Sequence, residues 1–201
     1  MRPERAQPHL PDSAEAALRE EVDRLTAELA RARAEAASLE ALAHEDPLTG
    51  LLNRRGFLRE LSRAVAFRSR YGNPVALLVA DLDRLKPIND RFGHGAGDDA
   101  LRHVSAILRR NLRASDSIGR IGGDEFAMTV WQIDEESAQR KARALQAALA
   151  ASPLRCGDRP VAVEASFGAV ALVPGDTPEA ALARADALLY AEKRERSALR
   201  R

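Results

Sequence analysis

Two glycines followed by two acidic residues, in the run Gly122-Gly123-Asp124-Glu125-Phe126, limit the fold of this chain more than any other feature. The run separates two stretches rich in strand-forming residues, Ser117 to Ile121 and Phe126 to Trp131. Gly-Gly between such stretches is a signal for a tight β-hairpin turn. We therefore expect a hairpin that presents Asp124 and Glu125 at or just past its turn, where a metal ion or a substrate can reach them.

Composition and charge restrict the classes of function. The chain has 201 residues, 45% of them apolar, which is enough for a proper core. Its 31 basic and 30 acidic residues give a net charge of +1, which does not indicate a nucleic-acid binder. The longest clean apolar run, Val75 to Ala80, is too short to span a membrane, so we expect a cytoplasmic protein without membrane insertion. The single cysteine, Cys156, excludes an intrachain disulfide.

The N-terminal part of the chain predicts a coiled coil. Residues 1–12 contain three prolines and are expected to be irregular. Residues 13–45, the expected coiled-coil helix, contain neither glycine nor proline. Apolar residues recur there in alternating steps of four and three: Leu18, Val22, Leu25, Leu29, Ala32, Ala36, Leu39 and Ala43. This seam predicts about four heptads and a parallel homodimer. The alternative is an amphipathic helix lying on its own domain, because periods of 3.5 and 3.6 differ little over this length.

Residues 46–201 match the size of a single domain. Periodicity predicts, in order, a helix over 57–68, a buried strand over 74–80, a helical segment, a helix over 101–112, the hairpin, a helix over 135–151, a strand over 161–171 and a helix over 178–194. Strands and helices interleaved in this way indicate an α/β (α+β) fold, with a split βαβ sheet and helices against one face.

A second group of acidic residues lies at the end of the buried strand. This strand runs directly into Asp81-Leu82-Asp83, and α/β sheets commonly hold ligands at the C-terminal ends of strands. Asp124 and Glu125 can meet this segment if the hairpin lies beside the strand. Hard oxygen ligands of this kind suit Mg²⁺ or Mn²⁺, which bind substrate phosphates through few protein carboxylates. The combination indicates phosphoryl or nucleotidyl transfer, although a single acid is more often a solvated charge or a helix cap.

The residues that follow suit a purine nucleotide. Lys86 supplies a cation for phosphate, and Asn89 and Asp98 supply the donor and acceptor pattern of a guanine edge. The glycines between them, at 93, 95 and 97, allow a backbone to approach a nucleotide.

Motifs in matching order resemble the GGDEF domain of diguanylate cyclases over about Asp46 to Arg196. They are Asp46-Pro47-Leu48-Thr49-Gly50-Leu51-Leu52-Asn53-Arg54, the Asp81 segment, the hairpin run, Ser166-Phe167-Gly168 and Arg184-Ala185-Asp186-Ala187-Leu188-Leu189-Tyr190. The resemblance implies a palm-like, ferredoxin-like fold with a central antiparallel or mixed sheet flanked by helices. It also implies an enzyme that condenses two GTP molecules into cyclic di-GMP and releases two pyrophosphates.

The resemblance assigns roles to particular residues. Those matching ligands of Mg²⁺ (or Mn²⁺) are Asp81, the Leu82 carbonyl, Asp124 and Glu125. Asp124 also matches the proton acceptor for the attacking 3′-hydroxyl, with Glu125 assisting, and Lys86 matches a transition-state stabiliser. Substrate contacts are expected at Asn89, His94, Asp98, Gly122, Gly123, Lys193 and Arg196. Each subunit of such an enzyme holds one GTP, so the reaction needs a homodimer, which the coiled coil would tether.

Arg113-Ala114-Ser115-Asp116 resembles the RxxD site at which cyclic di-GMP inhibits the family. Taken alone, Arg113 and Asp116 are equally compatible with a helix end followed by a turn. A second arginine from a partner chain usually completes such a site, and Arg140 and Arg143 are both candidates.

The sequence departs from the family pattern at Leu85, where Phe is common, and at Glu192, where a small residue is typical. The glycine that often precedes the second phosphate-binding cation is also missing, which leaves the roles of Lys193 and Arg196 open.

Two other interpretations compete with the enzyme. A catalytically silent GGDEF domain could serve as a cyclic di-GMP receptor or dimeric adaptor, and a coiled-coil scaffold would explain the heptads but not the spaced carboxylates. The sequence does not indicate the input signal, the downstream pathway, or whether dimers pair into tetramers.

Overall fold

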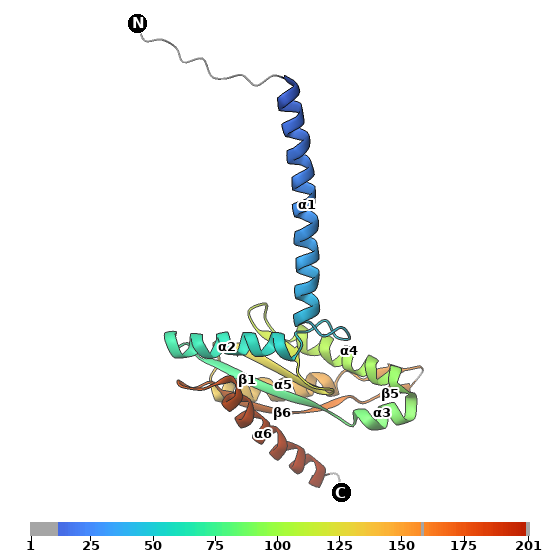
Figure 1. Cartoon of the computed structure of the whole chain (residues 1–201). Coiled ribbons are helices and arrows are strands. Elements are labelled where there is room, and N and C mark those ends of the chain that lie inside the picture. Colours follow the sequence, from blue (N-terminus) through green and yellow to red (C-terminus); the bar gives the residue numbers. More distant parts are fainter. Residues whose placement is uncertain (1–11, 158, 200–201) are drawn as a thin grey trace. The chain divides into compact units, whose positions relative to one another are not determined.

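The computed structural model describes residues 12–157 and 159–199 (Figure 1). The helices are α1 (Asp12–His44), α2 (Arg54–Tyr71), α3 (Leu85–Phe92), α4 (His94–Arg110), α5 (Glu135–Ala150) and α6 (Pro178–Leu199). The strands are β1 (Val75–Asp83), β2 (Ser117–Arg120), β3 (Glu125–Trp131), β4 (Leu154–Cys156), β5 (Arg159–Val161) and β6 (Glu164–Ala171). The irregular segment expected at 1–12 lies outside the described residues, except that Asp12 begins α1. The chain divides into two compact units between Leu42 and Ala43.

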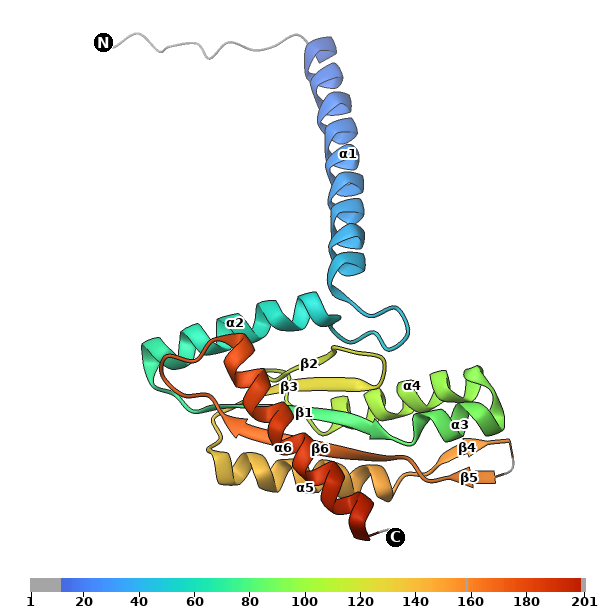
Figure 2. The same ribbon diagram turned by 60° about the horizontal axis from the view of Figure 1, so that its bottom comes forward.

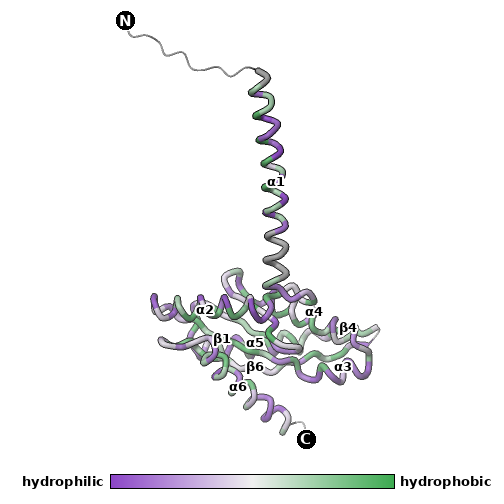
Figure 3. The backbone as a smooth tube through the Cα atoms, viewed as in Figure 1, coloured by the Kyte–Doolittle hydropathy of each residue, from purple (hydrophilic) through white to green (hydrophobic). Residues whose placement is uncertain are grey.

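The described part of the first unit lies within α1, an uninterrupted helix of 33 residues. Leu18, Val22, Leu25 and Leu29 of the heptad seam are about half exposed on it. Hydrophobic and hydrophilic positions alternate along the described part of this helix (Figure 3). The expected helix is thus confirmed, and its apolar seam is available for contact. No helix within the described residues is both long and apolar enough to cross a membrane.

The second unit is built on a four-stranded sheet in the order β2-β3-β1-β6, with every neighbouring pair antiparallel. β1 lies in the interior because its first six residues, Val75–Ala80, are all buried apolar side chains. It pairs with β3 on one side and β6 on the other. The expected central antiparallel sheet is confirmed, and the hairpin lies beside the buried strand.

Helices cover both faces of this sheet, so the expectation that they lie against one face was wrong. On one face Leu78 and Ala80 pack in a core with α4 and α5, and on the other Leu77 and Val79 pack in a core with α2 and α6. Figure 2 shows α6 crossing one face of the strands. The physical reason is that β1 carries apolar residues at consecutive positions, which supply both of its faces with core side chains.

Local signals set the ends of several elements. The Asn53 side chain accepts a hydrogen bond from the Gly56 amide at 2.9 Å and caps the start of α2, while Gly72 ends it with a positive φ of 74°. The strand expected over 161–171 is interrupted: β5 ends at Val161 and β6 begins at Glu164. β5 pairs instead with β4 in a separate two-stranded ribbon, whose three-residue strands are too short to show a periodic pattern.

Candidate active site

Strand alternation places two acidic side chains on the α2 and α6 face of the sheet. Val75, Leu77 and Val79 of β1 point into that core. Asp81 and Asp83 continue the same alternate positions past the end of the core. Leu82 points to the opposite face and is buried in the core with α4 and α5. The apolar pattern of β1 therefore determines that both carboxylates emerge together at its C-terminal end.

The hairpin brings Asp124 to the same place, whereas Glu125 lies opposite Asp81 in the strand register but does not line the pocket there. In the register of β1 and β3, Asp81 lies opposite Glu125. The Leu82 amide donates a hydrogen bond to the Asp124 carbonyl at 3.0 Å, which makes the Asp81 and Glu125 positions a non-hydrogen-bonded pair. Side chains in such pairs approach most closely across an antiparallel ladder. Asp124 and Glu125 are separated by more than 40 positions from Asp81 in the sequence, and the sheet joins them.

The two glycines have different surroundings. A Cβ atom built on Gly122 would lie 2.4 Å from Oε2 of Glu125, so the Glu125 side chain lies over Gly122. A Cβ atom on Gly123 would meet nothing within 4 Å. Neither glycine has a positive φ. A side chain at 122 would therefore displace the Glu125 carboxylate, whereas Gly123 leaves an open surface next to Asp124.

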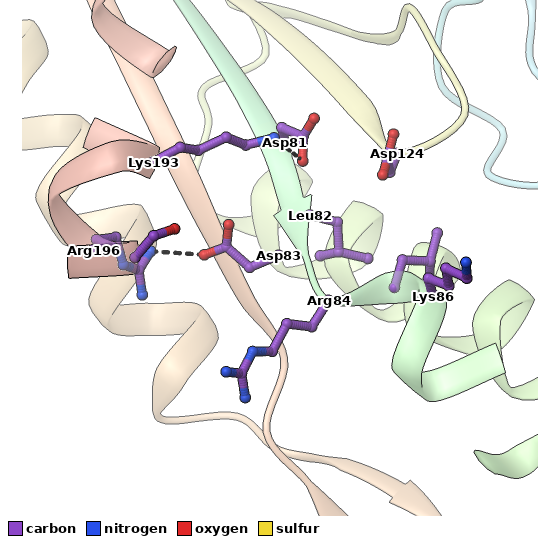
Figure 4. A pocket seen from close by; sticks show the side chains of 10 residues that line it. Asp81, Leu82, Asp83, Arg84, Lys86, Asp124, Lys193 and Arg196 are labelled. Carbon is purple, nitrogen blue, oxygen red and sulfur yellow. Dashed lines mark ion pairs between the residues drawn. The ribbon is translucent and has the colours of Figure 1, made fainter. Parts of the chain in front are cut away.

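Helix α6 contributes two cations. Ala181, Ala185 and Leu189 bury one face of α6 against the sheet. Continuing along this face, Lys193 reaches Asp81 with Nζ to Oδ1 at 2.6 Å, and Arg196 reaches Asp83 with Nη1 to Oδ2 at 3.0 Å. Figure 4 shows these two ion pairs on one side of β1 and Asp124 on the other side of Asp81. Ala181, Ala185, Leu189, Lys193 and Arg196 recur at intervals of three or four residues, so the core residues and the two cations lie on the same face of α6.

A pocket of about 500 Å³ lies between these groups. Its lining is Asp81, Leu82, Asp83, Arg84, Leu85, Lys86, Asp124, Lys193, Arg196 and Ser197. Burial, together with the charges of Asp124 and Asp83, raises the pKa of Asp81 above its usual range, although the hydrogen bond from Lys193 opposes this. The pocket therefore combines clustered negative charge with cations at its rim.

One backbone feature of the pocket was not predicted from the sequence. Arg84, between β1 and α3, has a φ of 62°, in the left-handed region that non-glycine residues seldom adopt. It joins the strand to α3 without an intervening loop, so Lys86 follows the end of β1 closely enough to line the pocket. No sequence signal marks this position, because the residue is neither Gly nor Asn.

The expected guanine-binding residues lie outside this pocket. Asn89 is on α3, and His94 and Asp98 are exposed on α4, directly after the Gly93 turn. A Cβ on Gly97 would lie 1.9 Å from Oδ1 of Asn89, so the Asn89 side chain rests on Gly97, next to Asp98. This Oδ1 is buried and has no hydrogen-bond partner. The α3–α4 turn thus brings Asn89 and Asp98 together.

Arg113 and Asp116 lie in the turn between α4 and β2. The Asp116 carboxylate accepts hydrogen bonds from the Arg113 amide at 2.9 Å and from the Trp131 amide at 3.1 Å. Arg113 itself is exposed. Asp116 therefore fixes the turn and connects it to the C-terminal end of β3. It also holds the Arg113 backbone at a defined place on the surface.

The departure at Glu192 has a structural explanation. β6 is an edge strand, so some of its backbone groups need partners other than a neighbouring strand. Glu192 accepts a hydrogen bond from the Phe167 amide at 2.6 Å, and Arg196 donates one to the Ala165 carbonyl at 2.8 Å. A small residue at 192 could not make the first contact. Glu192 thus belongs to the support of α6 on β6.

The hairpin loop is also tied to the turn that precedes α2. Arg120 donates to the Gly123 carbonyl through Nε at 3.1 Å and Nη2 at 2.7 Å, and its Nη1 lies 3.2 Å from Oδ2 of Asp46. The Asp46 carboxylate also accepts hydrogen bonds from Thr49. The sequence identifies Asp46 only as part of a motif and does not indicate a role for Arg120. No local pattern relates two positions that are so far apart in the chain.

Comparison with known proteins identifies the family. A family model described as "Diguanylate cyclase, GGDEF domain" matches residues 43–198. The diguanylate cyclase DgcP of Pseudomonas aeruginosa is 40% identical over 149 residues, which cover 74% of this chain and 22% of DgcP. The diguanylate cyclase TpbB of the same species (strain UCBPP-PA14) is 40% identical over 183 residues, which cover 90% of this chain and 42% of TpbB. The chain thus spans less than half the length of either relative.

A solved structure agrees with these relatives. The coiled coil and GGDEF domain of DgcB from Caulobacter crescentus, in complex with c-di-GMP, superimposes with a TM-score of 0.82 and 30% identity. The match covers 89% of this chain and 95% of the DgcB chain. The family model and these relatives agree with the motifs and with the fold, and the chain therefore belongs to the GGDEF-domain diguanylate cyclase family.

Proposed function

We propose that this chain is a diguanylate cyclase that condenses two GTP molecules into cyclic di-GMP with release of two pyrophosphates. The observation that carries the proposal is the pocket at the C-terminal end of β1, where Asp81 and Asp124 come together beside the cations Lys86, Lys193 and Arg196. In each half-reaction the 3′-hydroxyl oxygen of one GTP bonds to the α-phosphorus of the other. The bond between the α-phosphorus and its bridging oxygen breaks, and pyrophosphate leaves.

The donor atoms suit a hard divalent cation, Mg²⁺ or Mn²⁺. Asp81, the Leu82 carbonyl, Asp124 and Glu125 would hold it; burial first, and then the charges of Asp124 and Asp83, raise the pKa of Asp81, and a cation would offset both. When bound, the metal would supply positive charge against the phosphates. No three acidic, histidine or cysteine side chains converge on one point among the described residues, so substrate phosphates and backbone oxygens would complete the ligand set.

The remaining residues bind and orient the substrate. Lys86, Lys193 and Arg196 line the pocket as cations for the triphosphate, and Lys86 stabilises the charge that develops during transfer. Asp124 accepts the proton of the 3′-hydroxyl. Gly123 leaves space for the triphosphate to lie against the backbone. The α3–α4 turn, with Asn89, His94 and Asp98, contacts guanine and ribose.

Because each domain holds one GTP, the reaction requires two copies of the chain. The exposed seam of α1 supports a coiled-coil homodimer. With Val22 and Leu29 at a positions, the g positions carry Glu21, Glu28 and Glu35 and the e positions carry Arg19, Thr26, Arg33 and Glu40. A parallel pair places Glu28 near Arg33 of the second copy, which is attractive, and Glu35 near Glu40, which is repulsive. The apolar heptad seam, and not the charge pattern, therefore supports the parallel dimer.

Product inhibition through Arg113 and Asp116 is part of the proposal. The turn fixed by Asp116 presents the exposed Arg113 guanidinium to a guanine edge or phosphate of cyclic di-GMP. Arg140, which pairs with Glu136 on its own helix, and the exposed Arg143 both remain candidates for the second arginine. Arg113→Ala is expected to relieve inhibition by added cyclic di-GMP, and unchanged inhibition would contradict this assignment.

A silent receptor is the second candidate, favoured by one observation: Asp81, an expected metal ligand, is ion-paired with Lys193 at 2.6 Å. Incubation of the purified protein with GTP and Mg²⁺, with chromatographic detection of cyclic di-GMP, separates the two. The cyclase predicts product from the native chain and from Asp99→Asn, an exposed control on α4, but none from Asp124→Asn. No product from the native chain, together with binding of cyclic di-GMP, would establish a receptor.

A further inference from the structure

We propose that Arg120 is a positioning residue for the reaction: it holds the hairpin loop in the conformation that places the Asp124 carboxylate for catalysis. This inference rests on the proposed cyclase activity. Arg120 does not line the pocket and acts through the backbone of its neighbour, Gly123. Neither the motif resemblance nor the relatives' names assign it a role.

The side chain of Arg120 bridges two segments that are far apart in the sequence. All three of its guanidinium nitrogens are engaged: Nε and Nη2 bind the Gly123 carbonyl at 3.1 and 2.7 Å, and Nη1 binds the two Asp46 oxygens at 3.3 and 3.2 Å. The side chains of Arg120 and Asp46 are only 16% and 17% exposed. This planar fork of donors is fixed at both ends, which a single ammonium group cannot reproduce.

The Gly123 peptide needs such an anchor, because the Leu82 amide holds the Asp124 carbonyl at 3.0 Å and Arg54 holds the Ile121 carbonyl at 3.3 Å, but the Gly123 carbonyl is held by Arg120. Gly123 is exposed, has no side chain, and has open space where a Cβ would lie. Glycine also has the greatest backbone freedom. Within the loop, the Ile121 amide binds the Glu125 carbonyl at 2.9 Å, but the Gly122 amide is 3.4 Å from the same oxygen, near the limit of a hydrogen bond. The carbonyl that Arg120 clamps belongs to the peptide bond that leads directly into Asp124.

The other end of the bridge is rigid. Asp46 accepts hydrogen bonds from the amide and hydroxyl of Thr49 at 2.9 and 2.7 Å. Its own amide donates to the Leu51 carbonyl at 2.8 Å, and the Arg120 amide donates to the Leu52 carbonyl at 2.8 Å. The turn before α2 and the start of the hairpin therefore form one unit, and Arg120 extends that unit to the tip of the loop.

This geometry predicts a specific kinetic effect. A displacement of about 1 Å in a reacting group can cost on the order of 100-fold in rate. The proposed GTP contacts of Lys86, Lys193 and Arg196 come from α3 and α6 and do not depend on the loop, whereas the proposed contact at Gly123 does. Arg120→Ala is therefore expected to lower kcat roughly 10- to 100-fold and to raise KM for GTP by a smaller factor.

The test compares Arg120→Ala and Arg120→Lys with a matched arginine. Arg68 also donates to two backbone carbonyls, those of Leu172 and Gly72, at the other end of the sheet, so Arg68→Ala controls for a general loss of stability. Steady-state kinetics are measured well below each variant's unfolding temperature. The proposal expects Lys to restore thermal stability better than kcat, and guanidinium ion to rescue part of the kcat of Arg120→Ala but not of Arg68→Ala.

Amide hydrogen exchange supplies a readout that does not depend on activity. Faster exchange at residues 121–125 and at Leu82 is expected in Arg120→Ala and not in Arg68→Ala. Exchange unchanged at these amides, or a kcat within about 3-fold of the native value in both Arg120 variants, would overturn the positioning role. If the native chain makes no cyclic di-GMP, the proposed function fails, while the exchange experiment still decides whether Arg120 orders the loop.

Discussion

Replacement of Gly168 by alanine tests how α6 is held above the active site. Gly168 lies on β6 opposite Val79 and faces α6. A Cβ atom at this position would lie 2.0 Å from the Ala185 carbonyl oxygen and 2.7 Å from the Leu189 amide nitrogen. Both atoms belong to the backbone of α6, so no side-chain rotation can relieve the contact.

These distances give the size of the expected loss in stability and in GTP binding. Real Cβ contacts are essentially never shorter than 3.0 Å, so the helix must retreat by at least about 1 Å. Overpacking of this kind costs roughly 1–3 kcal/mol, which for a domain of this size lowers the unfolding temperature by about 2–12 °C. The same retreat stretches the Lys193–Asp81 and Arg196–Asp83 ion pairs, now 2.6 and 3.0 Å. A loss of about 1 kcal/mol in phosphate contacts would raise KM for GTP roughly 5-fold.

Thermal unfolding and GTP kinetics of Gly168→Ala measure both effects. Gly95→Ala is the matched control for stability, because a Cβ on Gly95 meets nothing within 4 Å; it is not a control for KM, because Gly95 belongs to the expected nucleotide-binding turn. It should not lower the unfolding temperature, since alanine favours the helix that contains it. An unfolding temperature and a KM in Gly168→Ala that equal those of the native chain would refute the close packing of α6 on β6.

Three further predictions concern the turn, the strand edge and the coil. Thr49 hydrogen bonds and the Arg120 charge lower the pKa of Asp46 although burial opposes them, so Asp46→Asn should destabilise the fold at pH 7. That difference should vanish in urea titrations as pH falls below about 4; a constant difference would contradict it. Glu192→Ala removes the partner of the Phe167 amide and should cost about 1–3 kcal/mol by urea unfolding, whereas exposed Glu195→Ala should cost less than about 0.5 kcal/mol. Leu25→Glu in the coil seam should shift sedimentation toward monomer and lower cyclase activity per chain at low concentration, and an unchanged dimer would argue against the coil.

Much of the fold follows from short-range patterns. The apolar run at Val75–Ala80 predicts an interior strand, and the Gly-Gly turn predicts a hairpin that begins near Ser117. Heptad spacing predicts the N-terminal helix. These features depend on residues within one or two turns of the chain, so the sequence shows them directly. The faces that the helices cover were not predicted, because a fully apolar strand has no polar side to exclude a helix.

The candidate site likewise has features that the sequence predicts and features that only the fold creates. The sequence by itself determined which side chains are candidates for the chemistry, because Asp81, Asp124 and Lys86 lie next to strand ends and turns that its pattern predicts. Only the tertiary structure decided that Asp81 lies opposite Glu125 and that α6 carries Lys193 over the same acids. It also decided that Arg120 joins Asp46 to the hairpin loop. Strand register and the meeting of distant segments arise from packing of the whole sheet, and no local pattern encodes them.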